Sequence, residues 1–205
     1  MRPPHRKQIK HFHEPGDLHE LTFSTYRRQP FLTNDQWQSW LAEHIDQACV
    51  SQRCRLIAFV FMPEHVHLLI LPEHPDPKTL ARFLAGVKRP VSVKVKQALQ
   101  ESESPLLEKL TIQERPGKTV FRFWQEGAGY DRNLNREQTV MSAIEYIHEN
   151  PVRRGLVERT SDWKWSSAKW YQTNGQSVDP DHPEIQHLPA EFFVRDSQNR
   201  LRSDE

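Results

Sequence analysis

The stretch Phe59-Val-Phe-Met-Pro-Glu-His-Val-His-Leu-Leu-Ile-Leu71 decides the fold of this chain. It predicts two strands, over about residues 55–62 and 65–71, and the second strand opens on a His-Val-His triplet. Side chains alternate between the faces of a strand, so His65 and His67 project to the same side. Two imidazoles at that spacing can hold one divalent cation and leave positions open for a third protein ligand, water and substrate. The alternative is that two histidines merely occupy the start of a half-buried strand.

A strand and a helix are expected before this stretch. Residues 18–26 alternate apolar and polar side chains, which is typical of a half-buried strand. Thr33-Asn34-Asp35 supplies cap residues for a helix over about 34–52. The apolar side chains of this helix recur every three or four positions, which predicts one buried face: Trp37, Trp40, Leu41, Ile45 and Ala48.

A second helix and a further strand are expected after it. The helix should cover about residues 77–100, and Pro90 should kink or break it because proline lacks the backbone N–H. Residues 101–118 are polar and predict a loop, and residues 119–125 predict a short strand. The order strand, helix, strand, strand, helix, strand predicts an α+β fold, a ferredoxin-like split βαβ sandwich with an antiparallel sheet.

A third amphipathic helix is expected after this strand. Asn135 should cap it, and Asn150-Pro151 should stop it after Glu149. Tyr146 and Asn150 are four residues apart, so they share one helix face if the helix reaches the asparagine. Each also has an ordinary explanation, the tyrosine as a core residue with its hydroxyl at the rim and the asparagine as a stop signal.

Composition limits the classes of function. The 205 residues include 28 Lys and Arg against 27 Asp and Glu, so any basic surface for nucleic acid must be local. No apolar run approaches the roughly 18 residues of a transmembrane helix, and the N-terminus has no hydrophobic signal core. Cys49 and Cys54 lack the partner pair of a four-cysteine zinc site. We therefore expect a cytoplasmic protein that has no membrane partner.

Two long motifs give the sequence a specific resemblance. They are Met-Pro-Glu-His-Val-His-Leu-Leu at residues 62–69 and Glu-Tyr-Ile-His-Glu-Asn-Pro-Val-Arg-Arg-Gly-Leu-Val-Glu-Arg-Thr-Ser-Asp-Trp-Lys-Trp-Ser-Ser at residues 145–167. Both resemble the motifs of IS200-like single-tyrosine (HUH) transposases, and they are most similar to the branch of REP-associated tyrosine transposases. The chain then divides into a basic flexible tail (1–17), an IS200-like transposase domain (18–171) and a polar C-terminal extension (172–205).

The resemblance implies roles for particular residues. His65 and His67 would ligate Mg²⁺ or Mn²⁺, and Tyr146 would be the nucleophile. Asn150 would be the third ligand, where many IS200-type enzymes have a glutamine that is one methylene longer. The implied activity is cleavage and strand transfer of single-stranded DNA at REP-like hairpins in DNA transposition, through a 5′-phosphotyrosine intermediate. The active unit is expected to be a monomer or homodimer.

Local basic and aromatic residues are candidate DNA contacts. The basic ones lie on the second helix and just after the tyrosine helix: Lys88, Arg89, Lys94, Lys96, Arg153 and Arg154. The aromatic ones could stack on bases, although core packing is the alternative for most of them: Trp124, Trp163, Trp165, Trp170 and Tyr171.

Several alternatives stay open at this point. Tyr130, which follows Gly129 in a predicted loop, is a rival nucleophile because loops often carry catalytic groups. A non-catalytic DNA-binding regulator of hairpin elements is a second reading of the motifs. A metal-dependent phosphoesterase that uses water, with Tyr146 only structural, is a third.

Overall fold

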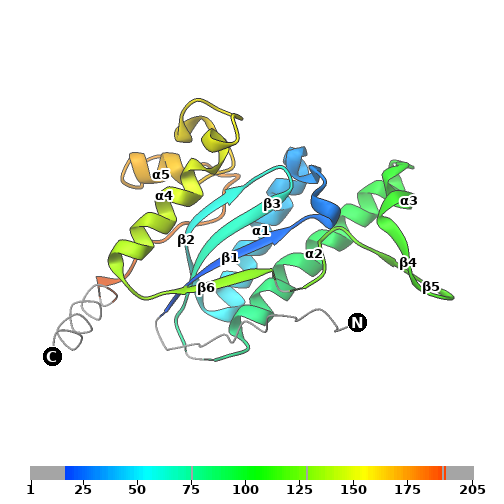
Figure 1. Cartoon of the computed structure of the whole chain (residues 1–205), viewed down its shortest axis with the longest axis horizontal. Helices are drawn as coiled ribbons and strands as arrows, with labels where there is room; N and C mark the ends of the chain where they lie inside the picture. The colour runs from blue at the N-terminus through cyan, green and yellow to red at the C-terminus, as the bar shows by residue number, and fades with distance from the viewer. Residues whose placement is uncertain (1–16, 75, 128, 191, 193–205) are drawn as a thin grey trace, which may run out of the picture.

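A computed structural model describes residues 17–74, 76–127, 129–190 and 192 of the chain (Figure 1). Its centre is a four-stranded antiparallel sheet with the order β2-β3-β1-β6. These strands are β1 (Leu18–Ser24), β2 (Cys54–Phe61), β3 (His65–Pro72) and β6 (Tyr130–Leu134). Strand order and pairing are those of a split βαβ sandwich, so the predicted fold class is confirmed. Of the predicted N-terminal tail, all but Asp17 lies outside the described residues.

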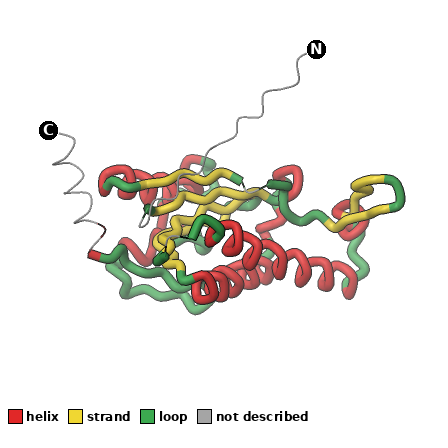
Figure 2. Tube along the Cα trace, turned by 90° about the horizontal axis from the view of Figure 1, so that it is seen from below, coloured by secondary structure: helices red, strands yellow, loops and turns green. Residues whose placement is uncertain are grey.

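Helices lie on both sides of this sheet, and Figure 2 shows the strands between them. Helices α1 (Asp35–Gln52) and α2 (Thr79–Glu101) share one core with the strand residues Leu21 and Leu68. Helix α4 (Glu137–Arg153) shares a second core with Leu18, Leu69 and Leu71 of the same strands. The alternation of side chains along β1 and β3 therefore separates the molecule into two layers, one on each face.

The predicted first helix is confirmed. Asn34 caps α1 by accepting a hydrogen bond from the backbone N–H of Trp37 at 3.1 Å, and Arg53 ends it in the left-handed conformation. Trp37, Leu41 and Ile45 are buried, as the apolar spacing indicates. Two single 3-10 turns, η1 (Tyr26–Arg28) and η2 (Phe31–Thr33), lead from β1 into this helix.

Helix α2 does not break at Pro90, one of the two outcomes that the sequence predicts. The helix is continuous from Thr79 to Glu101 and includes the proline. Val87 and Val91, on either side of the proline, are fully buried against α1 and the sheet. Packing along the whole apolar face offsets the one hydrogen bond that proline removes.

The region before β6 differs from the prediction. Residues 101–118 are not a plain loop, because they contain α3 (Leu106–Leu110) and β4 (Thr111–Arg115). The predicted strand at 119–125 is β5 (Lys118–Phe121), which pairs with β4 in a separate hairpin that projects beyond the end of the sheet (Figure 1). The fourth strand of the sheet is instead β6.

Both predicted ends of the third helix are wrong. The N-cap of α4 is Arg136 rather than Asn135, and the helix continues through Asn150 and Pro151. It stops where Gly155, at φ +65°, donates to Val152 O and Leu156 donates to Pro151 O. A proline this near the end of a helix removes only one late hydrogen bond, so the helix survives it.

The C-terminal part packs onto the domain. After η3 (Thr160–Asp162) and α5 (Ala168–Gln172), the chain places Ile185 on the α1/α2 core, and Leu188 and Phe192 on the α4 core. Trp124, Trp165 and Trp170 are buried, and the hydroxyl of Tyr171 donates to Ile57 O at 2.9 Å. Trp124 and Trp165 belong to the α1/α2 core, and Tyr171 packs against the α4 core. None of the helices in the described ranges combines the length and apolar composition needed to cross a bilayer.

Candidate active site

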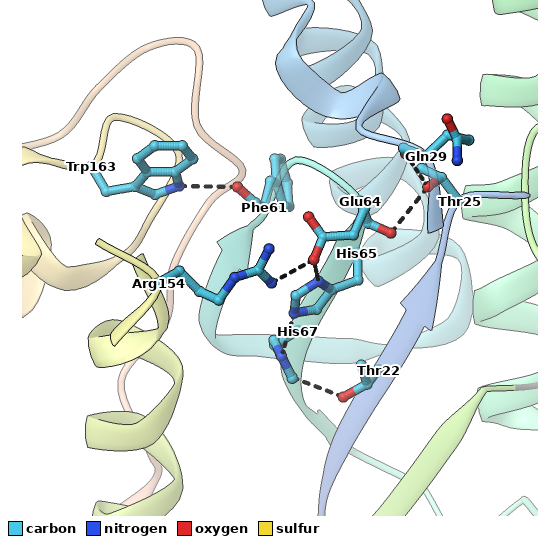
Figure 3. Close-up of polar contacts among 9 residues, drawn as sticks. All are labelled: Thr22, Thr25, Gln29, Phe61, Glu64, His65, His67, Arg154 and Trp163. Carbon is cyan, nitrogen blue, oxygen red and sulfur yellow. Dashed lines mark hydrogen bonds and ion pairs between the residues drawn. The ribbon is translucent and has the colours of Figure 1, made fainter. Parts of the chain in front are cut away.

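The two histidines of the central motif converge at the start of β3. Both imidazoles are nearly buried, with 5% of His65 and 6% of His67 exposed. Their Nε2 atoms lie 3.0 Å apart (Figure 3). Two lone pairs that face each other at this distance repel, so a proton or a cation must lie between the nitrogens. The His-Val-His spacing therefore places two nitrogens that can ligate a metal ion side by side, as the alternation of side chains along the strand predicts.

The other nitrogen of each ring is held by a neighbouring side chain. Nδ1 of His67 lies 2.8 Å from Oγ1 of Thr22, which is its partner in the β1–β3 register. Nδ1 of His65 lies 3.0 Å from Oε1 of Glu64. Hydrogen bonds of this kind fix the orientation of a ligating imidazole. Thr22 and Glu64 thus direct both Nε2 atoms into the same space.

Burial keeps both imidazoles neutral. It lowers the pKa of His67 to about 3, and the nearby His65 and Arg28 add to this effect. Burial also lowers the pKa of His65, although the Glu64 carboxylate opposes the shift. A neutral imidazole keeps the lone pair that a metal ion needs.

An ion pair joins the histidine turn to the end of α4. Nη1 of Arg154 donates to Oε1 of Glu64 at 2.6 Å, and the same oxygen contacts His65 (Figure 3). Burial alone would raise the pKa of Glu64, but Arg154 and His65 outweigh it and the net pKa is lowered. The guanidinium of Arg154, predicted as a DNA contact, is therefore engaged within the protein.

Tyr146 lies on the same face of the sheet as the histidines. Its ring is edge-on to His67, with 5.8 Å between ring centroids, and 40% of the residue is exposed. The guanidinium carbon of Arg153 lies 5.3 Å from the centroid of the phenol ring. The structure thus brings the predicted nucleophile beside the predicted metal ligands, although the two segments are about eighty residues apart in the sequence.

Asn150 lies one turn after the tyrosine and is nearly buried. Its Nδ2 donates to the carbonyl of Tyr146 at 2.8 Å, so this side chain folds back along its own helix. Among the residues that the structure describes, His, Cys, Asp and Glu side chains form no group of three able to hold a metal ion. The amide of Asn150, water and substrate oxygens are candidates for a third ligand beside the histidine pair.

A cleft of about 730 Å³ opens between α4 and the strands β1 and β6, next to His67 and Tyr146. Tyr130 also lines it, from a position opposite Thr22 in β6 and not from a loop as expected. Glu20 and Arg132 line the same cleft. Thr22 and Glu20 were not predicted as site residues, yet both fall on the polar side of the alternation that predicted β1.

The basic residues divide between the two faces. Arg153 and Arg154 lie beside the site, whereas the four predicted contacts on α2 belong to the helix layer on the opposite face. Nζ of Lys94 is 2.6 Å from Glu43, and Nζ of Lys88 donates to Gly127 O at 3.1 Å. Arg89 and Lys96 are exposed. The structure therefore does not bring the α2 cluster to the histidines.

The first half of the chain resembles a known protein family. Residues 17–115 match the family model described as "Transposase IS200 like", which includes the two histidines and ends before Tyr146. The resemblance seen in the sequence is confirmed, since this part of the chain is similar to IS200-like transposases.

Two known proteins are similar to this chain over most of its length. A protein of Haemophilus influenzae named as a REP-associated tyrosine transposase is 28% identical over 144 residues, which cover 66% of this chain and 75% of the relative. A solved structure of a REP-associated tyrosine transposase bound to a REP hairpin covers 90% of this chain and 94% of its own, with a TM-score of 0.57 and 16% identity. At that identity the structural match shows the fold.

Proposed function

We propose that this protein is a single-tyrosine transposase that cleaves and rejoins single-stranded DNA at hairpins. The observation that carries the proposal is the contact between the His67 and Tyr146 rings, at 5.8 Å between centroids, beside two converging imidazole nitrogens. A cation site and a nucleophile must both reach one phosphate in such a reaction, and the candidates for both lie side by side on this face of the sheet.

The residues present fit a divalent cation. Two nitrogens that are each about 2.1 Å from one ion, at a right angle, are about 3.0 Å apart. The observed Nε2 separation is 3.0 Å, and burial favours the neutral form of both rings. His65 and His67 would hold the ion, and the amide of Asn150 is the candidate third ligand. Mg²⁺ or Mn²⁺ bound there would supply positive charge to polarise the phosphate, and imidazole ligands favour Mn²⁺.

Tyr146 would act as the nucleophile. Its oxygen would form a bond to phosphorus while the bond to the 3′ oxygen breaks, which leaves a 5′-phosphotyrosine and a 3′-hydroxyl. The half-exposed phenol can meet a substrate, and the guanidinium of Arg153 lies over its ring, where it can also approach a bound phosphate. Because the phosphotyrosine conserves the energy of the phosphodiester bond, a second 3′-hydroxyl can reseal the strand without ATP.

Hairpin DNA is the substrate that the relatives suggest. The solved REP-associated tyrosine transposase is bound to a REP hairpin, and it shares the fold of this chain. The strand that reacts must be single, because its phosphate has to lie between the imidazole pair and the phenol with its bases unstacked. Hairpins that carry a single-stranded flank supply both features.

Trapping of a covalent protein–DNA adduct tests this function. The full chain is incubated with labelled hairpin oligonucleotides that carry single-stranded flanks, with Mn²⁺ or with EDTA, and resolved on a denaturing gel. We expect an adduct with Mn²⁺ and none with EDTA. Cleavage without an adduct would indicate a phosphoesterase that uses water. Hairpin binding without cleavage would indicate a regulator.

A further inference from the structure

The cleft beside the active site contains polar groups that the proposed chemistry does not use. Strands β1 and β6 form its floor, and the first half of α4 forms its wall with Gln138, Thr139 and Ser142. Its volume of about 730 Å³ falls within the usual range for pockets that bind small organic groups. The cleft is therefore large enough for part of a nucleotide.

The register of the strands orders the groups on this floor. Tyr130 is paired with Thr22, the residue that holds His67, and Arg132 is paired with Glu20. Two residues of a strand span about 7 Å, so Glu20 lies one step further along the cleft than the histidine pair. A nucleotide whose phosphate lies at the histidines can therefore extend its base towards Glu20.

Glu20 is a buried acceptor at the bottom of this cleft. Only 6% of the residue is exposed, and its Oε2 is 3.7 Å from Nη1 of Arg132, which is too long for a hydrogen bond. Burial raises the pKa of this carboxyl more than Arg132 lowers it. A buried carboxylate is stabilised by donors that reach its oxygens, and a ligand in the cleft can supply them.

Tyr130 offers an aromatic surface in the same place. Its exposed fraction is 48%, which is high for a large apolar side chain on a central sheet. An exposed ring beside a cleft is a suitable platform for a base, because every base can stack on it. Stacking alone does not select among bases, whereas a carboxylate does.

We propose that this cleft binds the base of a nucleotide next to the cleaved phosphate, and that Glu20 selects a base with an amino group. Adenine, cytosine and guanine each carry an amino group on the edge used for pairing, and that group donates to a carboxylate. Thymine has no amino group there, and its single N3–H donor lies between two carbonyl oxygens that the carboxylate repels, so it should bind less well. The assignment rests on the proposed function, since it takes the phosphate position from the histidine pair.

Base substitution combined with Glu20→Gln tests the assignment. Hairpin oligonucleotides are prepared with each base in turn at the two positions that flank the cleaved phosphate, and adduct formation is measured. We expect the wild-type protein to disfavour thymine at one of these positions by on the order of tenfold to a hundredfold. Glutamine can both donate and accept, so Glu20→Gln should remove most of that preference. An unchanged preference in the variant, or none in the wild type, would overturn the proposal.

A second pair of variants tests use of the cleft without relying on Glu20. Ser142→Trp would fill the cleft from the α4 wall, whereas Met141→Trp changes the adjacent residue, which is exposed and does not line it. We expect Ser142→Trp to lower adduct formation at least tenfold for every substrate, and Met141→Trp to leave it unchanged. Equal activity of the two variants would contradict a base in this cleft.

Binding measurements separate this inference from the proposed function. Fluorescence anisotropy of the same oligonucleotides with Tyr146→Phe, with and without Glu20→Gln, requires no cleavage. If the wild type forms no adduct but discrimination against thymine depends on Glu20, the base site stands and the proposed chemistry fails. If adducts form and Glu20→Gln changes no preference, the reverse holds. Absence of any oligonucleotide binding would overturn both.

Discussion

The two faces of the central sheet differ in what they bury, although the same strands supply both. Towards α1 and α2, strands β1 and β3 contribute Leu21 and Leu68 to a large apolar core. Towards α4, the adjacent residues on the same strands are Thr22 and His67, and the apolar cluster on that face is smaller. A single step along a strand thus separates a core residue from a site residue.

This difference indicates that the two faces have different roles. The α1/α2 face has the larger apolar cluster and holds the sheet together. On the α4 face, buried polar groups and an open cleft take the place of part of an apolar core. This arrangement weakens packing there but provides side chains that can bind or react with a substrate. Variants of neighbouring residues that point to opposite faces should therefore affect different properties.

Leu68 and His67 provide the sharpest contrast. Leu68→Ala should lower the free energy of unfolding by about 2–5 kcal/mol, because it leaves a cavity in the α1/α2 core, while the folded fraction still forms the adduct. His67→Ala should abolish the Mn²⁺-dependent adduct and cost less stability. Denaturant unfolding and the adduct assay measure the two effects. Equal losses of stability, or an adduct with His67→Ala, would remove the distinction between the faces.

The buried His148 of α4 should make the free energy of unfolding depend on pH. Burial lowers the pKa of His148 from 6.5 to about 4, and its Nε2 lies 2.7 Å from the Ser167 hydroxyl. Between these two values the unfolded chain binds the proton and the folded chain does not. Stability is therefore lost as the pH falls from about 6.5 to 4, by about 3 kcal/mol from this group.

Urea unfolding at several pH values measures this effect in the wild type and in His148→Gln. The variant lacks the titrating ring, so its stability should fall less steeply over the same pH range. Other buried histidines contribute equally to both proteins, and the difference between the curves isolates His148. Identical slopes would show that His148 is not the source.

Substitution of Gly129 should lower the free energy of unfolding more than substitution of Gly127. Both have positive φ angles, +84° and +100°, at which a side chain costs about 1–2 kcal/mol. A Cβ on Gly129 would also lie 2.1 Å from the carbonyl oxygen of Thr22, whereas a Cβ on Gly127 would meet no atom within 4 Å. Gly129→Ala should therefore be less stable than Gly127→Ala by about 1–3 kcal/mol. Thermal unfolding of both variants tests this, and equal stability would contradict the close approach of β6 to β1.

The Arg154–Glu64 pair should have the smallest effect, and only on activity. Arg154→Ala frees the carboxylate that orients His65, so we expect about a tenfold loss of adduct formation and a higher Mn²⁺ requirement. Arg159→Ala is the matched control, because Arg159 pairs with Asp162 at the surface. A Mn²⁺ titration of the adduct assay compares the variants. Equal curves would show that the ion pair does not position the site.

The elements with strong patterns were predictable from sequence. Alternation predicted β1, β2 and β3, and the spacing of apolar residues predicted α1, α2 and α4. Strand β6 was missed because Tyr-Asp-Arg-Asn-Leu has little apolar alternation, and it joins the sheet through backbone pairing with β1. The end of α4 was missed because tertiary packing and Gly155, rather than Pro151, decide where this helix stops.

Only the site residues that lie within the two sequence motifs were predictable. His65, His67 and Tyr146 were predicted, and the fold brings them together. Thr22, Glu20 and Arg132 could not be assigned to the site, because their proximity depends on the register of β1 against β3 and β6. The α2 lysines look like a basic surface in sequence, yet the sheet separates them from the histidines.

Identification of the residue that carries the DNA tests the central claim most directly. The adduct formed with Mn²⁺ is digested with trypsin and nuclease, and the nucleotide-bearing peptide is sequenced by mass spectrometry, with Tyr130→Phe and Tyr146→Phe in parallel. We expect the modification on Tyr146, in the wild type and in Tyr130→Phe, and no adduct with Tyr146→Phe. A nucleotide on Tyr130, or an adduct that persists in Tyr146→Phe, would contradict the claim that Tyr146 and the histidine pair form one catalytic site.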